Sequence, residues 1–293
     1  MLTHHCSGRE NLCRSLTVNI FSVIFKKMKK CLLFLFLSGY CLTGYAYGFD
    51  LAGIQPLAPY SVFSTFSAYS LDQGRTGMAL GADISHRPSF SRFTAQWGYG
   101  ITDKVELEMT IPYTVEWGTN GIQKTLDGFE DIGLVLKYRF FDEGRYGPAI
   151  ALIFDGTVPS GRDEFTTDGS YGTGLIVTKK VGPVTGHLNL FYSRPGSSNF
   201  SDEVTLAAGF EFAATHSLKV LGELYGQKSY SGSLDRLELR FGTRILTTDN
   251  IFTTIGAGYD TKNRTPEYRI LLSVSYMFPT KMKKIEQIEE KGD

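Results

Sequence analysis

The sequence predicts an all-β chain that closes into a transmembrane, antiparallel, up-and-down β-barrel of about twelve strands, of the outer-membrane type. Three observations predict this class. Apolar residues recur at every second position in segments of about ten residues. Short and long connections alternate along the chain, and aromatic residues gather near the segment ends. A Greek-key sandwich would need a long crossover and has no reason for the alternating connections.

Residues 1–46 are expected to be upstream residues plus an export signal. Met28, Lys29 and Lys30 supply a positive region, residues 31–42 an apolar core and residues 44–46 a small-x-small cleavage site. An uncleaved membrane anchor is the alternative, but the apolar run is short and is interrupted by Ser38 and Gly39. We expect Met28 to be the true start and the mature protein to lie in the bacterial outer membrane.

Removal of this signal changes the composition of the chain. All four cysteines, at positions 6, 13, 31 and 41, lie upstream of the cut, so neither disulfide nor thiol chemistry is expected. Residues 47–293 carry 24 basic and 29 acidic side chains, a net charge of −5, which gives no indication of nucleic-acid binding. No stretch after residue 50 has eighteen consecutive apolar residues, which excludes a transmembrane helix there.

The body of the chain divides into a segment at 47–74, periplasmic or plugging, a barrel at 75–278 and a charged periplasmic tail at 279–293. Gly, Asp, Asn, Pro and Ser punctuate the barrel and set its strands. The predicted strands are 75–86, 90–101, 104–116, 128–140, 148–159, 171–181, 185–194, 203–215, 218–228, 236–247, 251–260 and 267–278.

Alternation is clearest in residues 104–111, 131–140 and 236–245. In the first, Val105, Leu107, Met109 and Ile111 share one face, and charged or hydroxyl side chains share the other. The period alone does not say whether the apolar face meets lipid or a protein core. The connections favour lipid, because most links after even-numbered strands are tight and most after odd-numbered strands are long, as periplasmic turns and external loops are.

The last strand ends in a pattern that resembles the signal read by the outer-membrane assembly machinery: Tyr268, Ile270, Leu272, Val274, Tyr276 and Phe278. The aromatic girdles of the two membrane interfaces are predicted from residues near strand ends, with core packing as the alternative role: Trp97, Tyr99, Tyr113, Trp117, Tyr138, Phe140, Tyr192, Tyr259, Tyr268 and Phe278.

Four stretches resemble the outer-membrane family named for a meta pathway of phenol degradation, whose members are generally described as transporters. They are "YGITDKVELEMTIPY" (99–113), "LDGFEDIGLVLKYRF" (126–140), "TVPSGRDEF" (157–165) and "YGTGLIVTKKVGPVTGHLNLFYS" (171–193). Glu130 and Ser160 depart from the family's usual Gly and Thr. The resemblance covers residues 72–278 and implies the barrel fold; it does not license an aromatic ligand.

The polar faces supply a candidate lining for the interior. Ten charged residues are predicted to line the lumen and set selectivity: Arg92, Glu106, Glu108, Lys137, Arg139, Glu211, Glu223, Glu238, Arg240 and Arg244. One interpretation is structural, in which the charges pair across the lumen and close it. The other is functional, in which they line a narrow aqueous path. Twelve strands enclose only a small lumen, and loops or the segment at 49–71 could also plug it.

The sequence predicts no catalytic residue, cofactor or metal. His187 shares a strand face with Asn189 and Ser193, which faintly resembles the serine, histidine and asparagine sets of outer-membrane lipid hydrolases, but such residues are far more often ordinary lumen lining. "GTG" at 172–174 has no phosphate-binding context and is predicted to be a turn motif.

The leading hypothesis is a passive channel or transporter for a small solute, with an apolar or aromatic solute as the narrower expectation. A lipid-modifying enzyme at His187 and a closed structural or adhesive barrel, using loops at 118–127 and 160–170, are the alternatives. The expected partners are outer-membrane lipid, the outer-membrane assembly machinery and an unidentified small-molecule solute, with no nucleic acid.

Overall fold

The computed structural model describes residues 56–57, 61–86, 89–116, 126–229, 234–262 and 266–279. The predicted export signal, Met28, Trp117 and almost all of the charged tail lie outside the described residues, as does most of the loop at 118–127. Among the described residues, no helix is long and apolar enough to cross a membrane.

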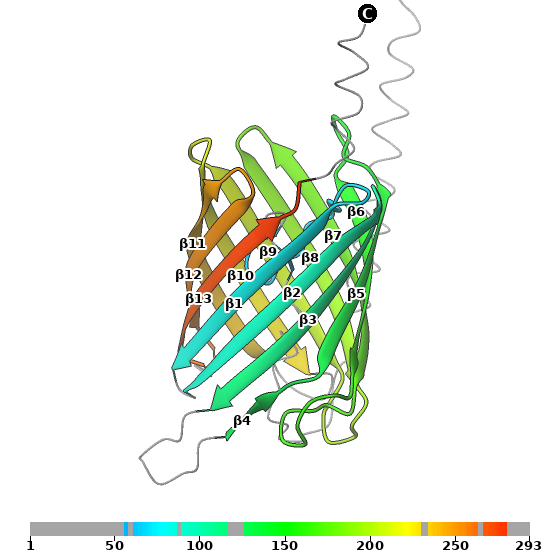
Figure 1. The fold of residues 1–293 in the computed structure, drawn as a ribbon, viewed down its shortest axis with the longest axis vertical. Helices are drawn as coiled ribbons and strands as arrows, with labels where there is room; N and C mark the ends of the chain where they lie inside the picture. The colour runs from blue at the N-terminus through cyan, green and yellow to red at the C-terminus, as the bar shows by residue number, and fades with distance from the viewer. Residues whose placement is uncertain are drawn as a thin grey trace, which may run out of the picture. The chain divides into compact units, whose positions relative to one another are not determined.

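The described strands form one antiparallel sheet (Figure 1). They are β1 (Thr76–His86), β2 (Phe90–Thr102), β3 (Val105–Glu116), β4 (Leu126–Phe129), β5 (Ile132–Phe141), β6 (Ala149–Val158), β7 (Ser170–Val181), β8 (Val184–Pro195), β9 (Glu203–Ala213), β10 (Leu218–Ser229), β11 (Leu234–Thr248), β12 (Ile251–Asp260) and β13 (Tyr268–Met277).

The sheet closes on itself. Apart from β4, each strand pairs with the strands before and after it in the sequence, and β1 pairs with both β2 and β13, which joins the two ends of the chain of strands. β4 and β5 are consecutive parts of one crossing, and both pair with β3. Counted by crossings, this is the predicted barrel of twelve strands.

The predicted single strand at 128–140 was wrong, because the structure breaks it between Phe129 and Ile132. At the break, the Glu130 carboxylate forms an ion pair with Arg92 inside the barrel, with 2.6 Å between Oε1 of Glu130 and Nε of Arg92. The Asp131 carboxylate turns to the β6–β7 connection and accepts the backbone N–H of Gly161 at 3.0 Å and of Thr167 at 2.9 Å. Glu130 therefore binds a residue of the barrel interior, whereas Asp131 binds the β6–β7 connection. The strand pairing with β3 is interrupted at these two residues.

The strands carry their apolar face outward. On β11, Leu239 and Phe241 are 39% and 58% exposed, whereas Arg240 between them is 1% exposed. The same alternation exposes Leu80 on β1 and Ile270 on β13. A surface of this kind is stable against acyl chains and not against water, which confirms the outer-membrane type of the barrel.

The two ends of the barrel differ as the connections predict. The turns at 103–104, 182–183 and 249–250 lie at one end, together with the start of β1 and the end of β13. Figure 1 shows this end at the top and the longer connections at the bottom. We refer to them as the turn end and the loop end.

Candidate functional site

Residues 56–57 and 61–71, here called the inner segment, lie inside the barrel. Its deepest part is fixed by Glu223, which stands halfway along β10. One carboxylate oxygen, Oε2, accepts the backbone N–H of Phe63, Ser64 and Thr65 at 3.1, 2.8 and 2.9 Å, and the Thr65 hydroxyl at 2.7 Å. The carboxylate thus accepts hydrogen bonds from three consecutive backbone N–H groups, which would otherwise be buried without a hydrogen-bond partner.

Three further wall residues hold the inner segment as it returns to the turn end. Asn189 on β8 accepts from the Phe66 N–H at 2.6 Å and donates to the Phe66 carbonyl at 2.9 Å. Thr178 accepts from the Ala68 N–H at 2.8 Å, and Glu106 accepts from the Leu71 N–H at 2.9 Å. The backbone of the inner segment is thus paired with wall side chains in place of a neighbouring strand.

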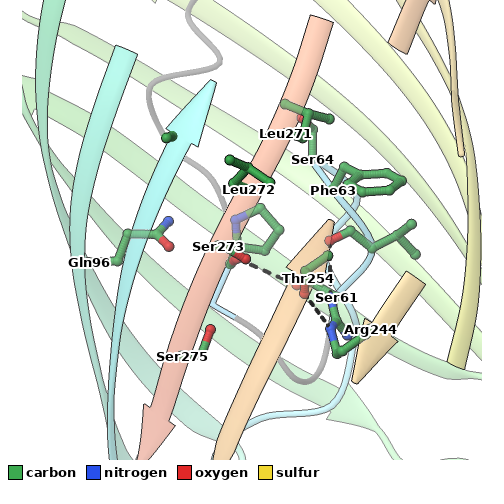
Figure 2. A pocket seen from close by; sticks show the side chains of 13 residues that line it. Ser61, Phe63, Ser64, Gln96, Arg244, Thr254, Leu271, Leu272, Ser273 and Ser275 are labelled. Carbon is green, nitrogen blue, oxygen red and sulfur yellow. Dashed lines mark hydrogen bonds between the residues drawn. The ribbon is translucent and has the colours of Figure 1, made fainter. Parts of the chain in front are cut away.

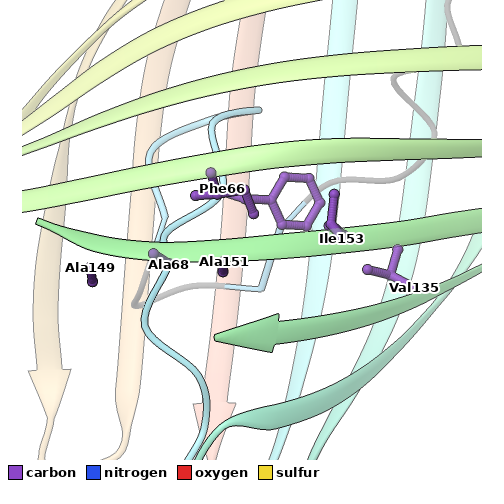
Figure 3. Close-up of a cluster of buried hydrophobic side chains, with 7 residues drawn as sticks. Phe66, Ala68, Val135, Ala149, Ala151 and Ile153 are labelled. Carbon is purple, nitrogen blue, oxygen red and sulfur yellow. The ribbon is translucent and has the colours of Figure 1, made fainter. Parts of the chain in front are cut away.

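Apolar contacts complete the fit. Figure 3 shows Phe66 of the inner segment with Val135 of β5 and Ile153 of β6, in a cluster of fully buried side chains. Glycines leave room where the wall is closest. A Cβ at Gly209 would lie 2.8 Å from a Val62 methyl group and 3.2 Å from the Thr65 Cβ, and a Cβ at Gly256 would meet the Phe63 ring.

The structure places nine of the ten predicted lining residues in buried positions on the wall, facing away from the exposed apolar side chains. Arg139, whose side chain is 17% exposed, lies at the turn end and pairs with Asp142 at 2.9 Å. The nine buried residues are Arg92, Glu106, Glu108, Lys137, Glu211, Glu223, Glu238, Arg240 and Arg244.

Apart from Arg92, which pairs with Glu130, these charges gather in three groups. At the turn end of β3 and β5, Lys137 lies 2.9 Å from Glu106 and 3.8 Å from Glu108. On β9, Glu211 lies 2.6 Å from Lys219 and 3.5 Å from Arg244. The third group lies toward the loop end, where Glu238 bonds to three arginines: Arg236, Arg240 and Arg269.

The arginine group also reaches the inner segment. Arg240 donates to Glu223 at 2.8 Å and to the Ser64 hydroxyl, and its guanidinium lies 4.6 Å from the centroid of the Tyr225 ring. Arg269 pairs with Asp83 on β1. Such buried charges are tolerable because each is paired and hydrogen-bonded.

The serine, histidine and asparagine residues singled out on β8 are not brought together, because Ser193 stands six residues after His187 on the same strand, about 20 Å away along it. His187 Nδ1 lies 3.0 Å from the Thr178 hydroxyl, and its Nε2 lies 3.7 Å from Glu211. Asn189 uses both ends of its amide on Phe66. Within the described part of the chain, no group of three or more His, Cys, Asp or Glu side chains could hold a metal ion.

A pocket remains between the inner segment and the wall of β1, β2, β12 and β13 (Figure 2). It leaves a space of about 30 Å³, enough for one or two water molecules, and is partly open to solvent. Its wall residues are mostly short, among them Ser273 and Ser275, and Ser275 is fully buried with no hydrogen-bond partner for its hydroxyl among the described residues. Val62, Phe63 and Leu271 supply apolar surface.

Sequence reasoning missed the hydrogen-bonding role of residues 61–71 and the loop-holding role of Asp131. The inner segment has little periodicity and few charges, so the pattern showed no partner for its backbone. Asp131 stood in a predicted strand, where its place between an acidic residue and an apolar run gave no sign of a break.

Two solved structures are similar to this fold. An outer membrane channel from Pseudomonas putida F1 matches with a TM-score of 0.54 and 14% identity, covering 72% of this chain and 98% of that one. A structure of the NanC porin matches with a TM-score of 0.52 and 8% identity, covering 69% and 100%. No match was found among curated proteins.

The amino-acid sequence also matches one family model over most of the barrel. Residues 88–278, which include β2 to β13, match the family model described as "Putative MetA-pathway of phenol degradation". The chain belongs to this family.

Proposed function

We propose that this protein is a passive channel of the bacterial outer membrane, in which small solutes pass beside the inner segment. The supporting observation is the pocket between the inner segment and the β1, β2, β12 and β13 wall, where short side chains leave a small space beside the segment. The similar solved structures described as a channel and a porin support the same class.

The inner segment is expected to stay in place while solute passes. Glu223 alone accepts four hydrogen bonds from it, and hydrogen bonds to charged groups contribute about 1.5–3 kcal/mol each. Withdrawal of the whole segment would therefore cost well over 5 kcal/mol by the same values. A path along the pocket avoids that cost.

The lining of the pocket favours a solute with an apolar or aromatic body. Phe63 and Leu271 offer apolar contact, while Ser273, Ser275 and Gln96 offer hydrogen bonds from neutral groups. Arg244, the charged residue of this lining, donates to Thr254 at 3.0 Å and pairs with Glu211, so its charge is balanced.

Single-channel recording in planar bilayers tests the proposal. Wild-type protein should conduct in 1 M KCl, and a Ser273→Trp variant should lose most of its conductance because the indole fills the pocket. Thr243→Trp is the matched control, since Thr243 neighbours Arg244 on β11 and lies on the outer face. Equal conductance in wild type and Ser273→Trp would exclude the proposed path.

A further inference from the structure

The inner face of β7 carries two glycines, Gly172 and Gly174, in the "GTG" stretch. The prediction of a turn there was wrong, because both glycines lie within β7 (Ser170–Val181). A Cβ at Gly172 would lie 2.6 and 2.7 Å from the two carboxylate oxygens of Asp155 on β6. A Cβ at Gly174 would meet the Phe191 ring on β8. The glycines thus form a shallow trough that the two side chains enter from either side.

Asp155 differs from the other acidic residues of the inner wall. Glu130 pairs with Arg92 at 2.6 Å, Glu238 pairs with Arg240 at 2.8 Å, and Glu203 accepts from Gln227 at 2.6 Å. Asp155 has no ion pair or hydrogen bond with any other side chain among the residues that the structure describes. Its half-buried carboxylate stands three positions before Val158, the loop-end residue of β6.

An apolar surface adjoins this carboxylate. Phe191 is partly exposed and packs edge-on against Phe66, with ring centroids 5.7 Å apart. Ile153, 1% exposed, faces Gly174 from the other side. Because Gly172 and Gly174 are two residues apart, the carboxylate and the aromatic ring are separated by about 7 Å along the strand.

A carboxylate without a partner in a partly desolvated place favours a cation, since ion pairing offsets the cost of its burial. An aromatic ring within one side-chain length adds cation–π attraction and apolar contact. An inorganic cation would use the carboxylate alone, whereas an ammonium group on an apolar body would use both surfaces.

We infer that Asp155 and Phe191 form a recognition site for small organic cations in the loop-end half of the lumen. This inference rests on the proposed function and narrows it, because solutes that carry a positive charge on an apolar or aromatic body would be concentrated before they reach the pocket.

The test uses benzylammonium as the probe, with benzyl alcohol as its neutral counterpart and K⁺ as the inorganic cation. In bilayers, millimolar benzylammonium should reduce the wild-type K⁺ current, and benzyl alcohol should not. Asp155→Asn should require at least ten times more benzylammonium and should lower the K⁺ over Cl⁻ permeability ratio at least twofold. Phe191→Leu should weaken benzylammonium block and leave the K⁺ over Cl⁻ ratio unchanged.

The matched control is Glu203→Gln, which changes an acid of the same half of the lumen that already has a partner. It should leave benzylammonium block unchanged. Equal block by benzylammonium in wild type and Asp155→Asn would overturn the inference. This holds also if Asp155→Asn changes the K⁺ over Cl⁻ permeability ratio.

A second measurement separates this inference from the proposed function. Benzylammonium should raise the thermal unfolding midpoint of the wild-type protein in detergent, and of Glu203→Gln, but not of Asp155→Asn. That result would support the site even if no current were observed in any variant. A detergent-solubilised wild type whose midpoint does not respond would contradict the site.

Discussion

The Glu223 carboxylate accepts both the backbone N–H and the side-chain hydroxyl of Thr65, at 2.9 and 2.7 Å. These two residues lie 158 positions apart in the sequence, and their contact fixes the deepest part of the inner segment in the middle of the barrel. A buried side chain on β10 therefore fixes the position of the inner segment, and with it the width of the space between the segment and the wall.

Glu223→Ala should release this part of the inner segment. Loss of a charge-assisted hydrogen bond costs about 1.5–3 kcal/mol, and every 1.4 kcal/mol is a factor of ten. Hydrogen exchange measured by mass spectrometry should accelerate at least tenfold across residues 63–65, and conductance should rise. Glu203→Gln, which contacts Gln227 instead of the inner segment, is the control. Unchanged exchange in Glu223→Ala would contradict the role of this carboxylate.

Gly256→Ala should displace the inner segment without opening the barrel wall. The added Cβ meets the Phe63 ring, so the ring must move. Amide exchange around residue 63 should increase in the single variant. Adding Phe63→Ala should restore protection at the neighbouring residues 64 and 65, because the smaller side chain removes the clash. If Phe63→Ala brings no recovery, the clash is not the cause.

The turn at 142–148 should hold the inner segment in a pH-dependent way. Tyr69 donates its hydroxyl to Glu143, which also accepts the Lys180 N–H at 3.0 Å and pairs with Lys179 at 3.1 Å. Burial raises the pKa of Glu143, but these hydrogen bonds outweigh it and leave the pKa below its ordinary value. Burial, followed by the bond to Glu143, raises the pKa of Tyr69.

Both shifts favour ionised Glu143 with neutral Tyr69. The stabilisation is present above the ordinary Glu pKa of about 4.3 and is lost as pH falls through the lowered value. It also weakens in alkali as Tyr69 ionises. Amide exchange at residues 68–71, corrected for intrinsic rates, should stay constant from pH 6 to 8 and increase near pH 3. Glu143→Gln should remove the acid dependence; an identical pH profile in that variant would refute the contact.

Asp131→Ala should loosen the connection between β6 and β7. The Asp131 carboxylate accepts from Gly161, Thr166 and Thr167. Limited proteolysis should cut residues 159–169 at least ten times faster in the variant, with the barrel's thermal midpoint changed little. Asp163→Ala, in the same loop, is the control. Equal cleavage in both variants would exclude Asp131 as the anchor.

Much of the barrel could be predicted from the sequence because the side-chain period of two directly determines the faces of each strand. Arg240 and its neighbours Leu239 and Phe241 show this directly. The break at Glu130–Asp131 could not be predicted in this way, because it depends on Arg92 and on a loop some thirty residues later in the chain. The Asp155 carboxylate was overlooked because its lack of a partner is visible only when all neighbouring strands are in place.

The most direct test of the central claim, passage beside a fixed inner segment, is a disulfide between Thr65→Cys and Gly209→Cys. A Cβ at Gly209 would lie 3.2 Å from the Thr65 Cβ, close to the span of about 3.5–4.5 Å in disulfides, and the chain after residue 41 has no other cysteine. Single-channel conductance in KCl should be the same for the oxidised and reduced protein. Conductance that disappears on oxidation and returns on reduction would show that the inner segment must leave, and would contradict this account.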